Sequence, residues 1–234
     1  MSRLRILSTL AVMGAMRDLA ALYGKDAGQA IEADFSPTVA LLDRLRRGEA
    51  ADIAILTAQG IDDLIREGLI RPGTRTDVAL SHVGVAVKTG APKPDIGSVT
   101  AFRAALLGAR AVAYSRIGAS GIYFAALIRE LGIEDAVNAR AVVVPSGFTA
   151  EHLVSGEADL AVQQISELMV VPGIEVVGPL PPEIQTVATF SAGLLAGSAQ
   201  PDEAAALLRF LASPQAAPVL RRSGLEPAGP SLSG

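Results

Sequence analysis

The sequence contains no cysteine and only two histidines, and these absences exclude several kinds of site. Without cysteine the chain can form neither a disulfide framework nor a thiolate metal site. With only His82 and His152, a histidine-rich metal site is excluded too. We expect both histidines to be structural or on the surface. The sequence therefore predicts a protein that uses neither a metal nor a cofactor.

Charge and long apolar runs are also scarce. Charged residues make up 19% of the chain and the net charge is −4, so there is no general basic field to attract nucleic acid. No stretch reaches the roughly 18 apolar residues of a membrane-spanning helix. No serine lies in a nucleophile-elbow motif with an evident histidine partner, which argues against an acyl-transfer hydrolase. A small anion can still bind through local dipoles.

The first residues resemble the start of a signal peptide, because Arg3 and Arg5 precede an apolar run. The run is short, however, and no small-residue cleavage site follows it. The spacing of Met16, Leu19 and Tyr23 instead predicts an amphipathic helix. We therefore expect the first strand and helix of the fold here and, without an export signal, a cytoplasmic protein. A leader preceding this sequence would make it periplasmic.

Half of the 234 residues are apolar, which is enough to bury a sizeable core. Predicted strands and helices alternate along the chain. The strands are expected at 4–8, 30–35, 52–56, 83–87, 110–114, 141–144 and 160–164, with further extended segments at 176–178 and 187–195. The helices are expected at 14–23, 38–47, 60–67, 98–107, 120–131, 150–154 and 201–211. This alternation predicts an α/β fold with mostly parallel sheets flanked by helices.

The alternation restarts after a Pro/Gly-rich loop at 89–98, and two extended stretches, 79–87 and 185–194, connect the halves. We predict two lobes joined by two hinge crossings. Lobe 1 is expected at 1–80 plus 190–234, and lobe 2 at 81–189. Because ligands of open α/β sheets lie outside the carboxyl ends of the strands, each lobe would offer its strand-to-helix loops to one shared cleft.

In the first lobe, hydroxyl side chains follow two neighbouring strands. Ser8 and Thr9 end the first strand, and Ser36 and Thr38 lie on either side of the entry to the second helix. A helix N-terminus has unpaired N–H groups and a partial positive charge, which suits an anion. Helix capping alone is the alternative explanation. Repetition of this chemistry in two adjacent loops favours a ligand site.

In the second lobe, a strand ends in Tyr114-Ser115, Arg116 follows in a glycine-containing loop, and Ser120-Gly121 opens a helix. This arrangement predicts an anion-binding nest with a charged clamp, with Ser120 serving as both helix cap and ligand donor. The alternative is that Arg116 is a solvated surface charge.

Two amides, Gln163 and Gln164, end an apolar strand and need partners if they are buried. Alternation along the strand lets one of them face the cleft, and we favour Gln164. Glu167 is expected to be a solvated charge at the start of a helix, with a catalytic role as the alternative.

Several segments together resemble a known family. They are RGEAADIAIL at 47–56, GAPKPD at 90–95, Tyr-Ser at 114–115 followed by ASGIY at 119–123, QQISEL at 163–168 and GPLP at 178–181. Their order and spacing resemble the molybdate-binding-protein-like branch of the type II periplasmic binding proteins, over residues 4–226. The resemblance implies two α/β lobes, a two-strand hinge and an oxyanion or carboxylate held by neutral donors. It implies donor loops at 8–11 and 36–38, with Ser115, Ser120 and the loop at Phe148 and Thr149 in the second lobe.

The sequence departs from the molybdate binders at two points. Gln164 stands where they tend to have a tyrosine, and Arg116 is an addition. The GAPKPD and QQISEL segments are more similar to a subgroup that includes aconitate isomerase. That similarity implies a carboxylate ligand, which suits a planar guanidinium.

Three functions follow from this resemblance. The first is a binder of a small di- or tricarboxylate. The second is an isomerase of an unsaturated polycarboxylate, with Tyr114, Ser115 and Glu167 as acid or base candidates. The third is a molybdate- or tungstate-type solute-binding protein whose partner, if the chain is exported, is an ABC transporter permease.

Overall fold

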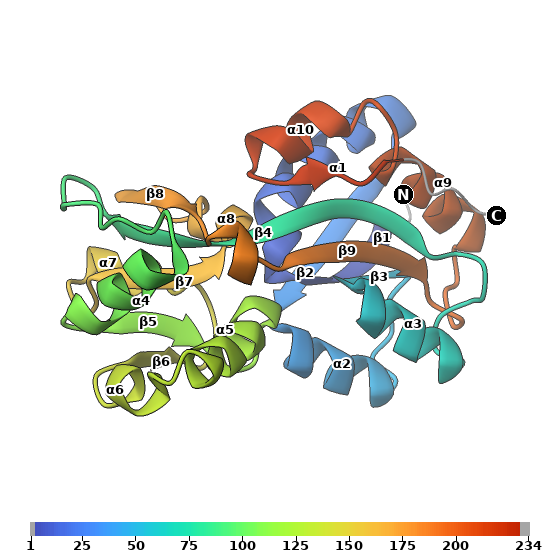
Figure 1. Cartoon of the computed structure of the whole chain (residues 1–234). Helices are drawn as coiled ribbons and strands as arrows, with labels where there is room; N and C mark the ends of the chain where they lie inside the picture. The colour runs from blue at the N-terminus through green and yellow to red at the C-terminus, as the bar shows by residue number, and fades with distance from the viewer. Residues whose placement is uncertain (1–2, 230–234) are drawn as a thin grey trace. The chain divides into compact units, whose positions relative to one another are not determined.

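The computed structural model describes residues 3–229, and the chain forms two compact units. Unit 1 consists of Met1–Ser81 and Ala188–Gly234, and unit 2 of His82–Val187. The chain passes between the units twice, along strand β4 (Thr76–Lys88) and at the start of strand β9 (Val187–Leu194). Figure 1 shows both as long arrows. The described residues include no helix of the length and hydropathy needed to cross a membrane.

Unit 1 is built on a sheet with the strand order β2-β1-β3-β9-β4. Its other strands are β1 (Arg3–Thr9), β2 (Ala30–Ser36), β3 (Ile53–Thr57) and the short β10 (Glu226–Pro227). Strands β1, β2 and β3 are parallel, whereas β9 is antiparallel to β3 and β10 is antiparallel to β4. The predicted parallel core of the sheet is confirmed, and antiparallel strands extend it.

Helices cover both faces of the unit 1 sheet. They are η1 (Leu10–Val12), α1 (Met13–Ala27), α2 (Thr38–Arg46), α3 (Ala58–Arg66), α9 (Pro201–Leu211) and α10 (Ala217–Arg222). Successive side chains of a strand point to opposite faces. Leu4 and Ile6 of β1 therefore pack in one core with α1, α9 and α10, and Leu7 packs in a second core with α2 and α3.

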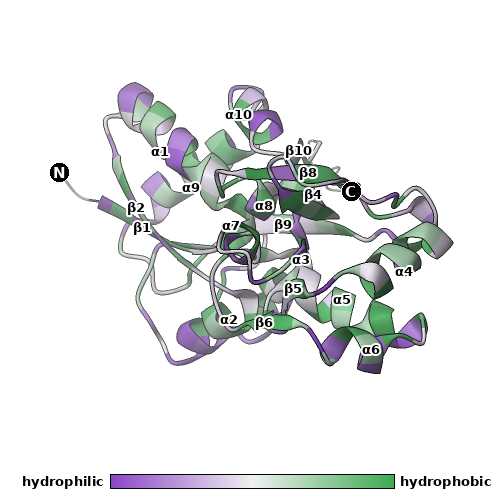
Figure 2. Cartoon of the chain, turned by 90° about the vertical axis from the view of Figure 1, so that its left-hand side faces the viewer, coloured by the Kyte–Doolittle hydropathy of each residue, from purple (hydrophilic) through white to green (hydrophobic). Residues whose placement is uncertain are grey.

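Unit 2 contains the rest of β4, flanked by β7 (Leu160–Gln164) on one side and β8 (Ile174–Pro179) on the other, both antiparallel to it. Beyond β7 follow β5 (Val112–Ser115) and β6 (Val142–Val144), and β7, β5 and β6 are parallel. Figure 2 colours much of β4 as hydrophobic, as expected for a strand that is buried over most of its length.

The helices of unit 2 are α4 (Val99–Gly108), α5 (Ala119–Glu130), α6 (Glu134–Asn138), α7 (Glu151–Val154), α8 (Ile165–Leu168) and the short η2 (Pro182–Ile184). Phe102 of α4 and Phe124 of α5 are fully buried in the main core of this unit, together with Tyr114 of β5. The ring centroids of Tyr114 and Phe124 are 5.1 Å apart in an edge-to-face contact. This packing fixes α5 against the end of β5.

The structure differs from the sequence prediction in a few elements. The strand expected at 83–87 is part of a 13-residue strand. The helices α6, α8 and α10 were not predicted, and all are short. Segments of four to six residues offer too few turns for a helical period to show in the sequence.

Candidate functional site

The four candidate hydroxyls of unit 1 lie at the ends of two paired strands. Strands β1 and β2 run in register, with Thr9 beside Ser36. Ser8 and Thr9 are almost completely buried, and Thr38 is the first residue of α2. The parallel pairing therefore brings the predicted donors of this unit to one edge of its sheet.

None of these hydroxyls caps the helix that follows it. Thr9 stands at the N-cap position of η1 without a side-chain capping bond, and the N-cap of α2 is Pro37. Ser8 donates its hydroxyl to the carbonyl of Thr9 at 3.1 Å. Thr57, at the end of β3, shows the contrast, because its Oγ1 accepts the N–H of Gly60 at 3.2 Å and so caps α3. Capping therefore does not explain the hydroxyls of β1 and β2.

Arg44 of α2 contacts the candidate site of unit 1, and sequence reasoning missed it. Its Nη1 donates to Ser36 Oγ at 2.6 Å. The same guanidinium contacts Asp34 at 2.5 Å and Glu49 at 2.7 Å. The hydrogen bond from Arg44 lowers the pKa of Glu49 to about 2. Since Arg44 occupies a lone pair of Ser36 Oγ, the hydroxyl proton of Ser36 can be donated to an anion.

In unit 2 the first turn of α5 lies directly against the end of β5. A Cβ added to Gly121 would be 1.7 Å from the carbonyl oxygen of Ser115, so this approach requires glycine. The N-cap of α5 is Gly118, so the expectation that Ser120 caps the helix is wrong. The first helical bond runs from Ile122 N to Gly118 O. The backbone N–H groups of residues 119–121 thus have no acceptor within the helix.

Ser115 and Arg116 lie in the turn that precedes α5. Ser115 is buried, and its Oγ accepts the N–H of Ile117 at 3.2 Å. Arg116 is exposed, but it is not simply solvated. Its Nε donates to the Tyr114 hydroxyl at 3.1 Å, and its guanidinium lies 5.8 Å from the centroid of that ring. The Tyr114 hydroxyl donates in turn to Asn138 at 2.6 Å. Arg116 retains further N–H donors beyond this contact.

The two glutamines at the end of β7 have different environments. Gln163 Oε1 accepts two hydrogen bonds from Thr149, from its N–H at 2.8 Å and its hydroxyl at 2.9 Å, and Gln163 Nε2 donates to Gly147 O at 3.3 Å. Gln163 therefore holds the 147–149 loop. Gln164 is 1% exposed, and its Oε1 has no hydrogen-bond partner of ordinary geometry among residues 3–229, although the side chain faces the Glu167 N–H in a capping-box arrangement. A buried acceptor that receives no hydrogen bond reduces the stability of the folded state. Gln164 is therefore the glutamine whose side chain could accept a hydrogen bond from a ligand or a water molecule.

Glu167 is buried in α8, so the expectation of a solvated charge is wrong. Burial raises the pKa of its carboxyl to about 8, against the opposing effect of hydrogen bonds from the Gln164 N–H and the Gln163 side chain. The carboxyl is consequently protonated for the most part at neutral pH. It lies three residues from Gln164, whose N–H it accepts at 3.4 Å.

The remaining ionisable groups do not form a metal centre in the part of the chain that the structure describes, where no three potential ligand side chains cluster. His152 pairs with Glu157 through Nδ1 at 2.6 Å in a partly exposed contact.

The fold and the donors described above define a class, the type II periplasmic-binding-protein-like α/β proteins. The chain belongs to the bacterial extracellular solute-binding protein family, whose model matches residues 4–226. The family resemblance read from the sequence is thereby confirmed.

Three individual proteins show what the chain is similar to. It is 35% identical over 230 residues to an aconitate isomerase from a Pseudomonas species, covering 96% of this chain and 87% of that protein. The periplasmic molybdate-binding protein of Azotobacter vinelandii is similar in structure, with a TM-score of 0.81 and 19% identity over 95% of this chain and 98% of that one. The sulfate-binding protein SubI from Mycobacterium tuberculosis H37Rv has a TM-score of 0.74 and 15% identity, covering 99% and 88% of the two chains.

Proposed function

We propose that the protein binds a small di- or tricarboxylate, using neutral donors from both units. The observation that carries this proposal is the set of uncommitted donors at the strand ends. In unit 1 the Thr9 and Thr38 hydroxyls cap no helix, and in unit 2 the N–H groups of residues 119–121 lack a helical acceptor. Such donors favour an anion without requiring a buried cation.

A carboxylate is favoured over a tetrahedral oxyanion by two features. The relative at 35% identity, which covers nearly the whole chain, is named for a tricarboxylate, whereas the molybdate- and sulfate-binding structures share the fold at below 20% identity. Arg116 adds a planar guanidinium beside the donors of unit 2. That shape matches a carboxylate by two parallel hydrogen bonds.

The family description supports action outside the cytoplasm rather than the cytoplasmic location expected from the sequence. In that setting the protein delivers its ligand to an ABC transporter permease. The family description bears on the location and the partner of the protein. The proposed ligand rests on the donors described above.

Calorimetric titration tests the ligand. Wild type is expected to bind trans-aconitate or a related tricarboxylate in preference to molybdate and sulfate. Arg116→Ala should weaken carboxylate binding by about ten- to a hundred-fold, since a charge-assisted hydrogen bond contributes roughly 1.5–3 kcal/mol. Tight binding of molybdate, no binding of aconitate and no effect of the substitution would together show that the protein is an ordinary oxyanion binder.

Catalysis is a second candidate function, and the buried Glu167 favours it. Isomerisation of an aconitate needs a base to remove a proton from the methylene carbon, giving an allylic anion, and an acid to return a proton to the other end of that system. A carboxyl with a pKa of about 8 can perform both steps near neutral pH. Tyr114 is less suited, because its hydroxyl already bonds Asn138 and Arg116.

Proton NMR of cis- and trans-aconitate incubated with the protein tests this candidate. Wild type is expected to interconvert the two isomers, and Glu167→Gln to lose at least about a hundred-fold in rate, the lower end of what a general base contributes. Binding of trans-aconitate by the variant, measured by calorimetry, should be retained. Equal rates for the two proteins would show that Glu167 takes no part in the reaction. No conversion by wild type would show that the protein binds its ligand without isomerising it.

A further inference from the structure

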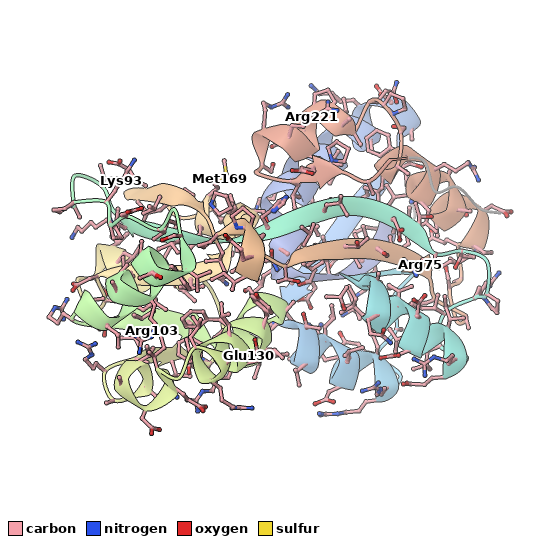
Figure 3. The ribbon with its side chains drawn as sticks, in the orientation of Figure 1. Arg75, Lys93, Arg103, Glu130, Met169 and Arg221 are labelled. Carbon is pink, nitrogen blue, oxygen red and sulfur yellow. The ribbon has the colours of Figure 1, made fainter. Side chains whose placement is uncertain are left out.

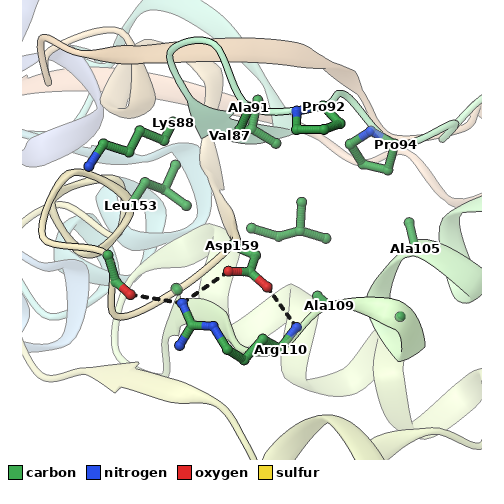
Figure 4. Close-up of a pocket in the computed structure, with 14 residues that line it drawn as sticks. Val87, Lys88, Ala91, Pro92, Pro94, Ala105, Ala109, Arg110, Leu153 and Asp159 are labelled. Carbon is green, nitrogen blue, oxygen red and sulfur yellow. Dashed lines mark hydrogen bonds and ion pairs between the residues drawn. The ribbon is translucent and has the colours of Figure 1, made fainter.

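Unit 2 contains a pocket that none of the candidate ligand residues lines. It has a volume of about 530 Å³, within the roughly 300–1,000 Å³ typical of small-molecule sites. It is lined by Arg110, just before β5 (Figure 4), and by Leu160, the first residue of β7. Ser115 and Gln164 lie at the other ends of these two strands. The pocket is therefore separate from the candidate site described above.

The walls of this pocket are mostly apolar. Val87, Leu153 and Leu160 line it and are buried at 1%, 1% and 4% exposure, and Pro92 and Pro94, which Figure 4 labels, line it as well. An apolar molecule placed here would lose contact with water on several sides, which is favourable. A polycarboxylate would instead bring several charges into apolar surroundings, which is costly.

One wall belongs to the GAPKPD segment, which the proposed function leaves unexplained. This loop is tied to β8 through Glu175. Glu175 accepts the Gly90 N–H at 3.1 Å and pairs with Lys93 at 2.9 Å, and the Lys93 charge holds the pKa of Glu175 below its usual value. Lys93 is labelled on this loop in Figure 3. Because Pro92 and Pro94 also fix the backbone, the wall is formed before any ligand arrives, which lowers the entropic cost of binding.

Three charged residues line the pocket, and two of them neutralise each other. Arg110 Nη2 contacts Asp159 at 3.0 Å, and the Arg110 backbone N–H donates to the same carboxylate at 2.8 Å. The third, Lys88, donates through Nζ to the Val154 carbonyl at 2.9 Å and has no carboxylate partner among residues 3–229. The lining therefore carries one positive charge in excess.

We propose that this pocket binds an aliphatic monocarboxylate of medium chain length. Its apolar body would lie against Val87, Leu160 and the two prolines, and its carboxylate would lie toward Lys88. This ligand class differs from the polycarboxylates of the proposed function, so the two proposals stand or fall separately.

Calorimetric titration of the whole protein with octanoate, butanoate and 1-octanol tests the role of the apolar walls. Octanoate is expected to bind at least ten-fold more tightly than butanoate, because each buried methylene contributes about 0.8 kcal/mol, roughly four-fold in affinity. Ala105→Leu and Ala105→Phe fill the pocket from α4 and should abolish binding of octanoate. Ala104→Phe, at the exposed neighbouring position, is the matched control and should leave it unchanged.

Lys88→Met tests the charge. It should weaken octanoate by about three- to five-fold, as expected for an exposed ion pair, and leave 1-octanol unaffected. Lys25→Met in unit 1 controls for the loss of one positive charge. Thermal unfolding of each variant shows that it is folded. The proposal is overturned if wild type does not bind octanoate, if a folded Ala105→Leu binds it as wild type does, or if trans-aconitate competes with it.

Discussion

At the scale of single residues, Glu167 and Gln164 are buried polar groups whose burial is poorly compensated. Gln164 Oε1 has no hydrogen-bond partner of ordinary geometry among residues 3–229, and Glu167 keeps a proton up to a pKa of about 8. Buried groups of this kind reduce stability, and proteins commonly retain them where a ligand or a reaction uses them. Both lie at the carboxyl end of β7, where a ligand of this fold is expected.

Glu167 makes stability depend on pH in a predictable direction. An unfolded glutamate loses its proton near pH 4.5, whereas folded Glu167 keeps it to about pH 8. Between these values the unfolded state binds fewer protons, so the free energy of unfolding falls as pH rises, by up to about 1.4 kcal/mol per pH unit. Glu167→Gln removes this dependence. Urea unfolding at pH 5, 6.5, 8 and 9 measures the free energy of unfolding of both proteins. The value for the variant should rise relative to that of wild type up to pH 8, and the difference should stay constant above it.

The exposed Glu151→Gln is the control for that series and should follow wild type at every pH. A constant difference between Glu167→Gln and wild type across the range would show that Glu167 is ionised throughout.

Which site residues could be predicted depends on how local their geometry is. Ser8, Thr9, Ser36 and Thr38 follow directly from the rule that loops after parallel strands meet at one edge of a sheet. Arg44 could not be found in this way, because its contact with Ser36 depends on how α2 packs beside β2. The bonds from Thr149 to Gln163 likewise join segments that only the tertiary fold brings together.

At the scale of elements, the junction of β5 and α5 depends on one glycine. A methyl group at position 121 would overlap the Ser115 carbonyl, so Gly121→Ala must push the helix away from the strand end. Overpacking of this kind costs about 1–3 kcal/mol or more. The control is Gly108→Ala at the end of α4, where a Cβ meets nothing within 4 Å.

Chemical denaturation of both variants measures the effect. Gly121→Ala should lose stability and ligand affinity together, while Gly108→Ala should be neutral or slightly stabilising. Equal stability of the two variants would mean that α5 does not need its close approach to β5.

Most elements longer than a few residues were predicted from the sequence within about two residues of their ends, because their apolar periods are strong. Strand β4 was predicted as a strand only at 83–87, within an extended stretch expected at 79–87, since polar Ser81 and His82 interrupt its apolar run in the middle. The partners of the two parts explain the continuity. The first part pairs with β10 and the second with β7 and β8.

At the scale of the whole molecule, the chain divides into two α/β units that it connects twice. Each unit has hydroxyl or backbone N–H donors at the carboxyl ends of its parallel strands, and in unit 2 the Arg116 guanidinium lies beside them. The central proposal is that the protein binds a carboxylate with the strand-end donors of each unit. Neither composition nor net charge could have indicated this, because the donors are ordinary hydroxyls and backbone amides.

The most direct test is calorimetric titration of trans-aconitate into Thr9→Val, which removes a hydroxyl from unit 1, Ser120→Ala, which removes one from unit 2, and the exposed Thr100→Val as control. Each of the first two should weaken binding by about three- to ten-fold, the usual contribution of a hydrogen bond, and the control should match wild type. A loss confined to the variant of one unit, with the other binding as wild type does, would contradict the claim that both units hold the ligand.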